Sequence, residues 1–296
     1  LLDLHNNTKL TELSCANNQI TSINVSGLTL LSSINCSYNN LTSLDVSTNT
    51  ALKYFTCNAN PLKEIKGYFA GNIATINAMG EGYIYYLYTP FNYFPDADVC
   101  AVSSDDNKYK IKDWTQGETV VSTSNNYNTA LLTGTLNVNF QSLVTFNSQD
   151  GGSYDDVWAD YNNLLSEPTA PVKTGYTFVG WYTDNEYTDK WDFENDKVTQ
   201  ALTLYAKWEL TSPVITSAAL TSNNSIALVW DGLSGVTGYE VFRSTSNNDD
   251  YTKIAETSET NYTDADLVAG TNYYYKIRSY LSTGDTNIYS EFSDVK

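Results

Sequence analysis

A 21-residue period runs through the first part of this chain and constrains the fold more than any other feature of the sequence. Cysteine recurs at this interval, and an asparagine follows each cysteine three residues later: Cys15, Cys36 and Cys57, then Asn18, Asn39 and Asn60. A fixed period of this length predicts a stack of similar turns of chain, in which each turn buries its apolar side against its neighbours. We therefore expect the beginning of the chain to be a stacked scaffold rather than a catalytic core.

Each unit reads L-x-x-L-x-C-x-x-N-x-[IL], which resembles the leucine-rich repeat. The resemblance implies a solenoid over residues 1–66, with short parallel strands along a concave face. Leu2, Leu4 and Leu10 resemble the end of a further repeat, and no polar cap precedes Leu1. Because solenoids need capped ends, we expect the solenoid to be truncated on its N-terminal side.

The alternation of apolar and polar residues around each cysteine is that of a strand and places the cysteines inside the stack. A metal site or a disulfide framework is the alternative. Zinc ligands, however, usually come in close C-x-x-C pairs, and each cysteine here is alone in its repeat. We expect Cys15, Cys36 and Cys57 to be free thiols that pack as small apolar groups, and Cys100 has no evident partner.

The asparagines that follow the cysteines lie where the chain must turn out of the strand. A buried asparagine amide can bond to backbone groups of its own turn and of the next repeat. We therefore expect Asn18, Asn39 and Asn60 to be structural residues.

The positions that point away from this interior form a candidate binding surface. They are small and polar, apart from two tyrosines and two charged residues. Tyrosine often anchors protein interfaces. We expect a partner to contact the concave face around Glu12, Asn35, Tyr38, Lys53 and Tyr54.

The charge balance argues against nucleic acids and anionic membranes as partners. The chain has 16 basic and 34 acidic residues, a net charge of −18, whereas nucleic acids and anionic membranes require Lys and Arg surfaces. No apolar run approaches the length of a membrane-spanning helix, so we expect no insertion into a membrane. The 24 tyrosines and the many threonines favour strands, and the chain is expected to be mostly β.

Residues 143–210 contain two specific motifs, G-Y-T-F-V-G-W-Y-T-D from Gly175 and L-T-L-Y-A-K-W from Leu202. The large apolar residues in and between them should form a core: Phe178, Trp181, Trp191, Tyr205 and Trp208. The segment resembles the Listeria–Bacteroides repeat, also called the internalin B-repeat. The resemblance implies a small β-grasp-like domain of bacterial surface proteins that serves as a spacer or as a binding module.

Residues 67–142 resemble a divergent copy of the same repeat. K-Y-K-I-K-D-W stands in place of G-Y-T-F-V-G-W, so that Trp114 corresponds to Trp181 and Phe140 to Trp208. The copy opens with the aromatic run Y-I-Y-Y-L-Y-T-P-F-N-Y-F-P. Such clusters can bind sugars by stacking, but more often they fill a core.

Residues 211–296 predict seven short strands, with Trp230 facing inward on the second. The stretch D-L-V-A-G-T-N-Y-Y-Y-K-I-R-S-Y resembles the L-x-P-G-T-x-Y-x-Y-x-V pattern of fibronectin type III domains, with Ala269 in place of the proline. The resemblance implies a β-sandwich in which the hydroxyl of Tyr273 bonds back to the chain just upstream.

The sequence offers little for catalysis. His5 is the single histidine, which supports neither a Ser–His–Asp or Cys–His pair nor a histidine-based zinc site. Paired carboxylates stand in expected turns without the alternating spacing of a calcium loop, at Asp105-Asp106, Asp155-Asp156 and Asp249-Asp250. We expect no enzyme activity and no cofactor, and calcium binding by a loop stays open.

The order of these segments resembles that of internalins, in which a solenoid recognises its target and β domains hold it away from the cell wall. We expect a monomeric, non-catalytic adhesion or protein-recognition module that is secreted or displayed on a bacterial surface. Two alternatives remain. One is a polysaccharide-binding or accessory region of a large exported carbohydrate-active protein, and the other is a stalk without a binding role.

Overall fold

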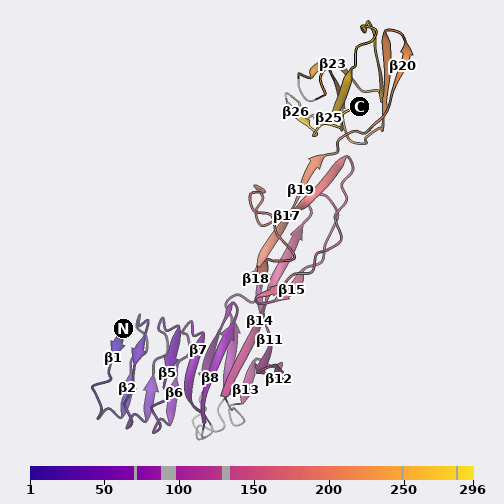
Figure 1. Cartoon of the computed structure of the whole chain (residues 1–296). Coiled ribbons are helices and arrows are strands. Elements are labelled where there is room, and N and C mark those ends of the chain that lie inside the picture. Colours follow the sequence, from indigo (N-terminus) through magenta and orange to yellow (C-terminus); the bar gives the residue numbers. More distant parts are fainter. Residues whose placement is uncertain (70–71, 88–97, 129–133, 248–249, 285) are drawn as a thin grey trace. The chain divides into compact units, whose positions relative to one another are not determined.

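The computed structural model describes residues 1–69, 72–87, 98–128, 134–247, 250–284 and 286–296. All regular secondary structure in the described residues is β-strand, so the fold is all-β (Figure 1). The chain divides into two compact units. The first unit contains Leu1–Thr145, Asp155–Glu167 and Asp192–Thr203, and the second contains Phe146–Tyr154, Pro168–Trp191 and Leu204–Lys296.

In the first unit, each 21-residue repeat contributes short strands that pair in parallel with those of the neighbouring repeats. One ladder consists of β2 (Glu12–Ser14), β4 (Ser33–Asn35) and β6 (Tyr54–Thr56). The strands between them pair in the same way, β1 (Leu2–Asp3) with β3 (Ile23–Asn24) and β5 (Ser43–Asp45) with β7 (Glu64–Phe69). Paired residues are 21 positions apart, as in Leu13 with Ile34 and Ile34 with Phe55. The period of the sequence is therefore the stacking interval of the chain.

The sheet that contains β5 and β7 continues beyond the repeats. β8 (Asn72–Met79) pairs antiparallel with β7 and parallel with β14 (Gly134–Asn147), which pairs with β11 (Tyr109–Gln116) and through it with β12 (Thr119–Ser122). Figure 1 shows β7, β8, β14 and β11 side by side. One hydrophobic core runs with this sheet, from Cys15 to Phe140. The predicted segment limits at residues 66 and 142 fall inside β7 and β14, and these limits stay predictions.

Shorter elements complete the first unit. A separate sheet consists of β9 (Gly82–Leu87), β10 (Asp98–Ser103) and β13 (Asn126–Asn128). β15 (Val157–Asp160) pairs with β14, and β16 (Asn163–Leu164) pairs with β18 (Lys197–Val198).

The strand pairs β11–β14 and β17–β19 share one local geometry, where β17 is Tyr176–Tyr182 and β19 is Leu202–Leu210. Trp181 pairs with Ala206 and Phe178 with Trp208, with a bulge just before Gly180. In the other pair, Trp114 pairs with Val138 and Ile111 with Phe140, with a bulge just before Asp113. Trp114 and Phe140 thus occupy the positions that Trp181 and Trp208 occupy.

A glycine lies under the aromatic ring of each strand pair. A Cβ on Gly151 would lie 2.4 Å from the ring of Trp208, and a Cβ on Gly82 would lie 2.1 Å from the ring of Phe140. Both distances are too short for any other residue without movement of a packed ring. The two strand pairs therefore share a close packing as well as a strand register.

The second unit ends in a sandwich of seven strands. One sheet has the order β20 (Ile215–Ser222), β21 (Ser225–Trp230), β24 (Asn261–Asp264). The other has the order β23 (Thr252–Thr257), β22 (Gly238–Ser244), β25 (Tyr274–Ser282), β26 (Asn287–Tyr289). Their inner faces bury a core that includes Trp230, whose ring meets that of Tyr239 edge-on at 5.5 Å.

Candidate recognition surface

The five predicted partner-binding residues lie on or beside the ladder β2–β4–β6. Tyr38 and Tyr54 are 58% and 51% exposed, which is unusual for aromatic residues. Glu12, Asn35 and Lys53 are exposed as well. For Glu12, Asn35 and Tyr54 the alternating strand pattern explains this, because the adjacent Leu13, Ile34 and Phe55 turn the opposite way into the core. The strand face therefore presents polar side chains and Tyr54, and Tyr38 lies in the turn that follows β4.

The backbone at Tyr38 has a conformation that the sequence did not lead us to expect. Asn17, Tyr38 and Ala59, one period apart, have φ angles of 57°, 55° and 52°. Asparagine tolerates this left-handed region, whereas tyrosine and alanine occupy it at a cost. The N–H of Tyr38 donates to the carbonyl of Asn58 at 2.8 Å, so the stacking of the turns stabilises this conformation. Asn17 was the one sequence signal for it.

The three repeat cysteines are buried, and none of them forms a disulfide. The thiol of Cys36 contacts the carbonyl of Thr56 at 3.4 Å, and its pKa is raised, first because it is desolvated by burial. The side chain of Cys100 and residue Asp249 lie outside the described part of the chain, as does most of the aromatic run after Tyr83. Within the described part, no three His, Cys, Asp or Glu side chains form a group that could hold a metal ion.

The asparagine ladder differs from the prediction in two ways. The amide of Asn39 donates to the carbonyls of Cys36 and Cys15, and its oxygen accepts from the N–H of Ile20. Asn60 repeats these bonds one turn later. The bonds therefore reach back to the preceding turn rather than forward to the next one. Asn18 is exposed rather than buried, and its side-chain amide donates to carbonyls of its own turn, those of Cys15 and Ala16.

The aromatic residues of the Gly175–Leu210 segment are buried to different degrees, whereas the sequence predicted a common core. Trp181 is buried and meets the ring of Phe146 edge-on at 5.0 Å. Phe178, Tyr205 and Trp208 are only half-buried, since a small sheet has too little opposing surface to cover every ring. Trp208 still satisfies its indole N–H, which donates to the carbonyl of Ser148 at 2.9 Å.

Tyr273 lies just before β25 in the sandwich. Its hydroxyl accepts a hydrogen bond from the N–H of Val268 at 3.0 Å, five residues upstream. This is the contact that the fibronectin resemblance implied. The ring of Tyr273 also carries the guanidinium of Arg243 at 5.5 Å, which in turn pairs with the buried carboxylate of Asp264 at 3.0 Å. Tyr273 therefore fixes a corner of the sandwich.

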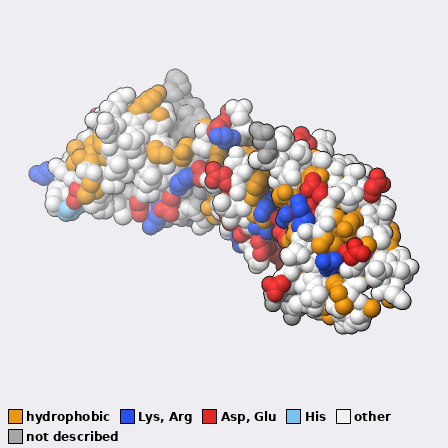
Figure 2. Space-filling model, turned by 90° about the horizontal axis from the view of Figure 1, so that it is seen from above, with side chains coloured by type: hydrophobic (Ala, Val, Ile, Leu, Met, Phe, Trp, Pro, Cys, Tyr) orange, Lys and Arg blue, Asp and Glu red, His pale blue; other side chains and the backbone are white. Residues whose placement is uncertain are grey.

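The surface charge is dispersed. On the face seen in Figure 2, Lys and Arg side chains form small groups among acidic and uncharged ones. A continuous basic surface of the kind that nucleic acids need is absent from that face. Among the described residues there is no helix long and apolar enough to cross a bilayer.

Residues 143–207 match the family model of the Listeria–Bacteroides repeat domain. The chain contains such a repeat. A 62-residue stretch is 45% identical to internalin H of Listeria monocytogenes and covers 21% of this chain and 11% of that protein. A 67-residue stretch is 45% identical to a protein of Evansella cellulosilytica named as a membrane protein, and covers 23% of this chain and 10% of the relative.

The chain thus spans about a tenth of the length of these curated relatives. Among solved structures, an Fn3-like protein from Clostridium thermocellum is 34% identical, with a TM-score of 0.26. The match covers 29% of this chain and 86% of the chain of the Clostridium thermocellum protein. The resemblance of residues 143–207 to the Listeria–Bacteroides repeat, drawn from the two motifs, is confirmed.

Proposed function

We propose that this chain is part of a bacterial surface or secreted protein and that it recognises a protein partner without catalysis. In this proposal the stacked 21-residue turns form a leucine-rich-repeat solenoid, and the repeat and sandwich segments act as spacers. The parallel in-register ladder β2–β4–β6 supports the proposal, because its polar face carries the exposed Tyr54 and the exposed Tyr38 lies in the turn beside it. The proposal includes neither a cofactor nor a nucleic-acid partner.

The position of the tyrosines supports a protein partner. Tyr54 lies on β6, and Tyr38 follows β4 by three residues, so they flank small polar positions such as Asn35 and Thr56. Exposed tyrosines among near-neutral polar contacts are typical of the anchors of protein interfaces. Glu12 and Lys53 add one charge of each sign, which favours orientation over general electrostatic attraction.

The test compares the full chain with a Tyr38→Ala, Tyr54→Ala double variant, both immobilised and exposed to membrane-protein extracts of host cells. We expect proteins that the unchanged chain captures to be lost from the double variant. Leu220→Ala is the control, because this side chain is large, apolar and 76% exposed but belongs to the sandwich. Capture that survives in the double variant would rule out this strand face. Absence of capture by any of the three proteins would favour a stalk.

A further inference from the structure

The outer face of the sheet β23–β22–β25–β26 carries cations that are stacked on aromatic rings. Lys276 Nζ lies 4.2 Å from the ring centroid of Tyr251 and 4.1 Å from that of Phe292. The guanidinium carbon of Arg278 lies 3.8 Å from the ring of Tyr289. Lys276 and Arg278 are two residues apart on one strand, so their charged groups project from the same side of the sheet.

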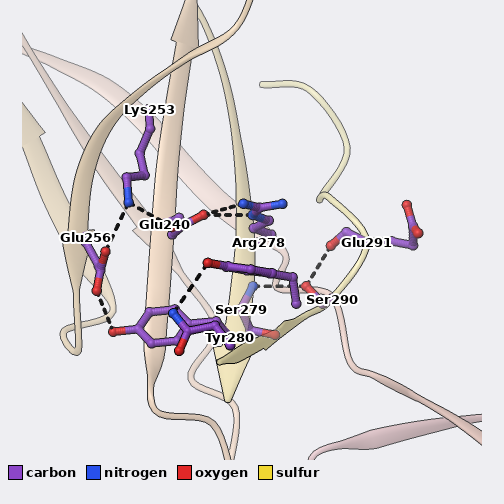
Figure 3. A network of polar contacts seen from close by, with 10 residues as sticks. Glu240, Lys253, Glu256, Arg278, Ser279, Tyr280, Ser290 and Glu291 are labelled. Atoms are coloured by element: carbon purple, nitrogen blue, oxygen red, sulfur yellow. Dashed lines mark hydrogen bonds and ion pairs between the residues drawn. The ribbon is translucent and has the colours of Figure 1, made fainter. Parts of the chain in front are cut away.

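A buried carboxylate holds the arginine in place. Glu240 accepts from Arg278 Nε at 2.8 Å and pairs with Lys253 at 2.8 Å (Figure 3). Lys253 is shared with Glu256, which also accepts from the hydroxyl of Tyr280. Glu240 stands opposite Arg278 on the adjacent strand, so it orients and neutralises the arginine from the side, and the stacked Tyr289 stays exposed.

Lys276 differs from its neighbours in its charge balance. No carboxylate of the described residues lies within ion-pair distance of it, whereas Lys253 and Arg278 both have one. Since its ammonium is flanked by two rings, it is oriented for an anion that approaches along the sheet. A cation without an ion pair that lies between aromatic rings suits a ligand that carries a carboxylate next to an apolar surface.

We propose that this face binds an acidic polysaccharide, whose uronate carboxylates pair with Lys276 and whose sugar rings pack on Tyr289 and Phe292. Sugar C–H groups stack on aromatic faces, and a flat sheet surface accommodates an extended polymer better than a compact ligand. An acidic peptide offers the same charge without the rings that would cover the aromatic residues. The proposal does not depend on the solenoid face and holds whether or not that face binds a protein.

The experiment measures binding of the full chain to polygalacturonate by calorimetry and by retardation in polymer-containing gels. We expect binding that weakens with added salt and falls roughly tenfold in Lys276→Gln, as for loss of one charge-assisted hydrogen bond. Tyr289→Ala should weaken it by a similar factor. Lys197→Gln removes the same charge from an exposed site outside the sandwich and should bind like the unchanged chain.

Two further ligands separate the causes of binding. The same polymer with methyl-esterified carboxyl groups should not bind, and polyglutamate should bind much more weakly. Equal binding of the esterified polymer would overturn the role of the carboxylate. Equal binding of polyglutamate would replace the polysaccharide with an acidic peptide. Failure of the unchanged chain to bind polygalacturonate, or equal binding by Lys276→Gln, would overturn the site itself.

Discussion

Single residues at the turns of the stack are held in a costly conformation. Tyr38 and Ala59 have left-handed backbones at the position where the first repeat has Asn17. An L-residue other than asparagine or glycine pays about 1 kcal/mol for this region. Burial of the Tyr38 ring offsets little of this cost in free energy, since the side chain is 58% exposed. A tyrosine kept at such a position is consistent with a role outside folding, which is the direction in which backbone outliers support functional inference.

Replacing Tyr38 by asparagine should therefore stabilise the fold while it removes the ring. We expect Tyr38→Asn to raise the free energy of unfolding by about 1 kcal/mol. Ala59→Asn is the matched control, because it relieves the same conformation one turn later without removing an aromatic ring. Chemical denaturation of both variants measures the gain. The account fails if neither variant is stabilised, and the binding role of Tyr38 fails if Tyr38→Asn captures partners as well as Ala59→Asn does.

At the scale of elements, the sandwich sheet is joined by a chain of ion pairs and hydrogen bonds through Glu240, Lys253, Glu256 and Tyr280. The hydrogen bonds from Lys253 and then Tyr280 hold the pKa of the Glu256 carboxyl below its ordinary value of 4.5. A carboxyl with a lowered pKa in the folded state stabilises the fold above its unfolded pKa. That contribution is lost as the pH falls through the folded pKa.

Glu256→Gln removes this titration and should change the pH dependence of stability. We expect the unchanged chain to be more stable than the variant near neutral pH, and the difference to shrink as the pH falls below about 4.5. Urea denaturation at a series of pH values measures it. Glu259→Gln removes an exposed carboxylate and should give a small difference that does not vary in this way. A constant difference for Glu256→Gln would show that its carboxyl is not coupled to Lys253.

At the scale of the whole molecule, the stacked turns share one core and one sheet with β8, β11 and β14, the strands of the predicted first copy. Ile65 is fully buried on β7 and pairs with Leu44 on one side and Ile76 on the other. Core contacts therefore connect the stacked turns to the following strands, and no linker separates them in the described part of the chain. This continuity makes the first copy an extension of the stack, whereas the sandwich at the end of the second unit has its own core.

Ile65→Ala tests whether the first unit behaves as one cooperative body. We expect it to cost about 2–5 kcal/mol, as for other buried Ile→Ala changes. Hydrogen exchange should speed up both in β2, β4 and β6 and in β11 and β14, and should leave the sandwich strands unchanged. Faster exchange confined to β2, β4 and β6 would show that the stack and the first copy are separate cooperative units.

Local patterns determined a large part of this structure. The 21-residue period predicted the stacking interval, because the repeat of apolar positions is written within each turn. The motif around Tyr273 predicted a contact five residues upstream, which the chain makes without distant help. The same holds for the outward side chains of the strands, such as Tyr54, since alternation along a strand decides which side chains point outward.

Only the tertiary structure decided the features that depend on distant partners. β8 pairs with β14 across about 60 residues, which joins the stack to the first copy, and no local pattern encodes such a pairing. The exposure of Asn18 depends on whether a turn lies against it, and the left-handed backbone of Tyr38 depends on the turn that follows. The sequence did not predict the cation–aromatic contacts of the sandwich face, because the strand register and the packing of distant segments bring Lys276 and Arg278 to their rings. The sequence determines what lies within a few residues or one period, and long-range packing determines the rest.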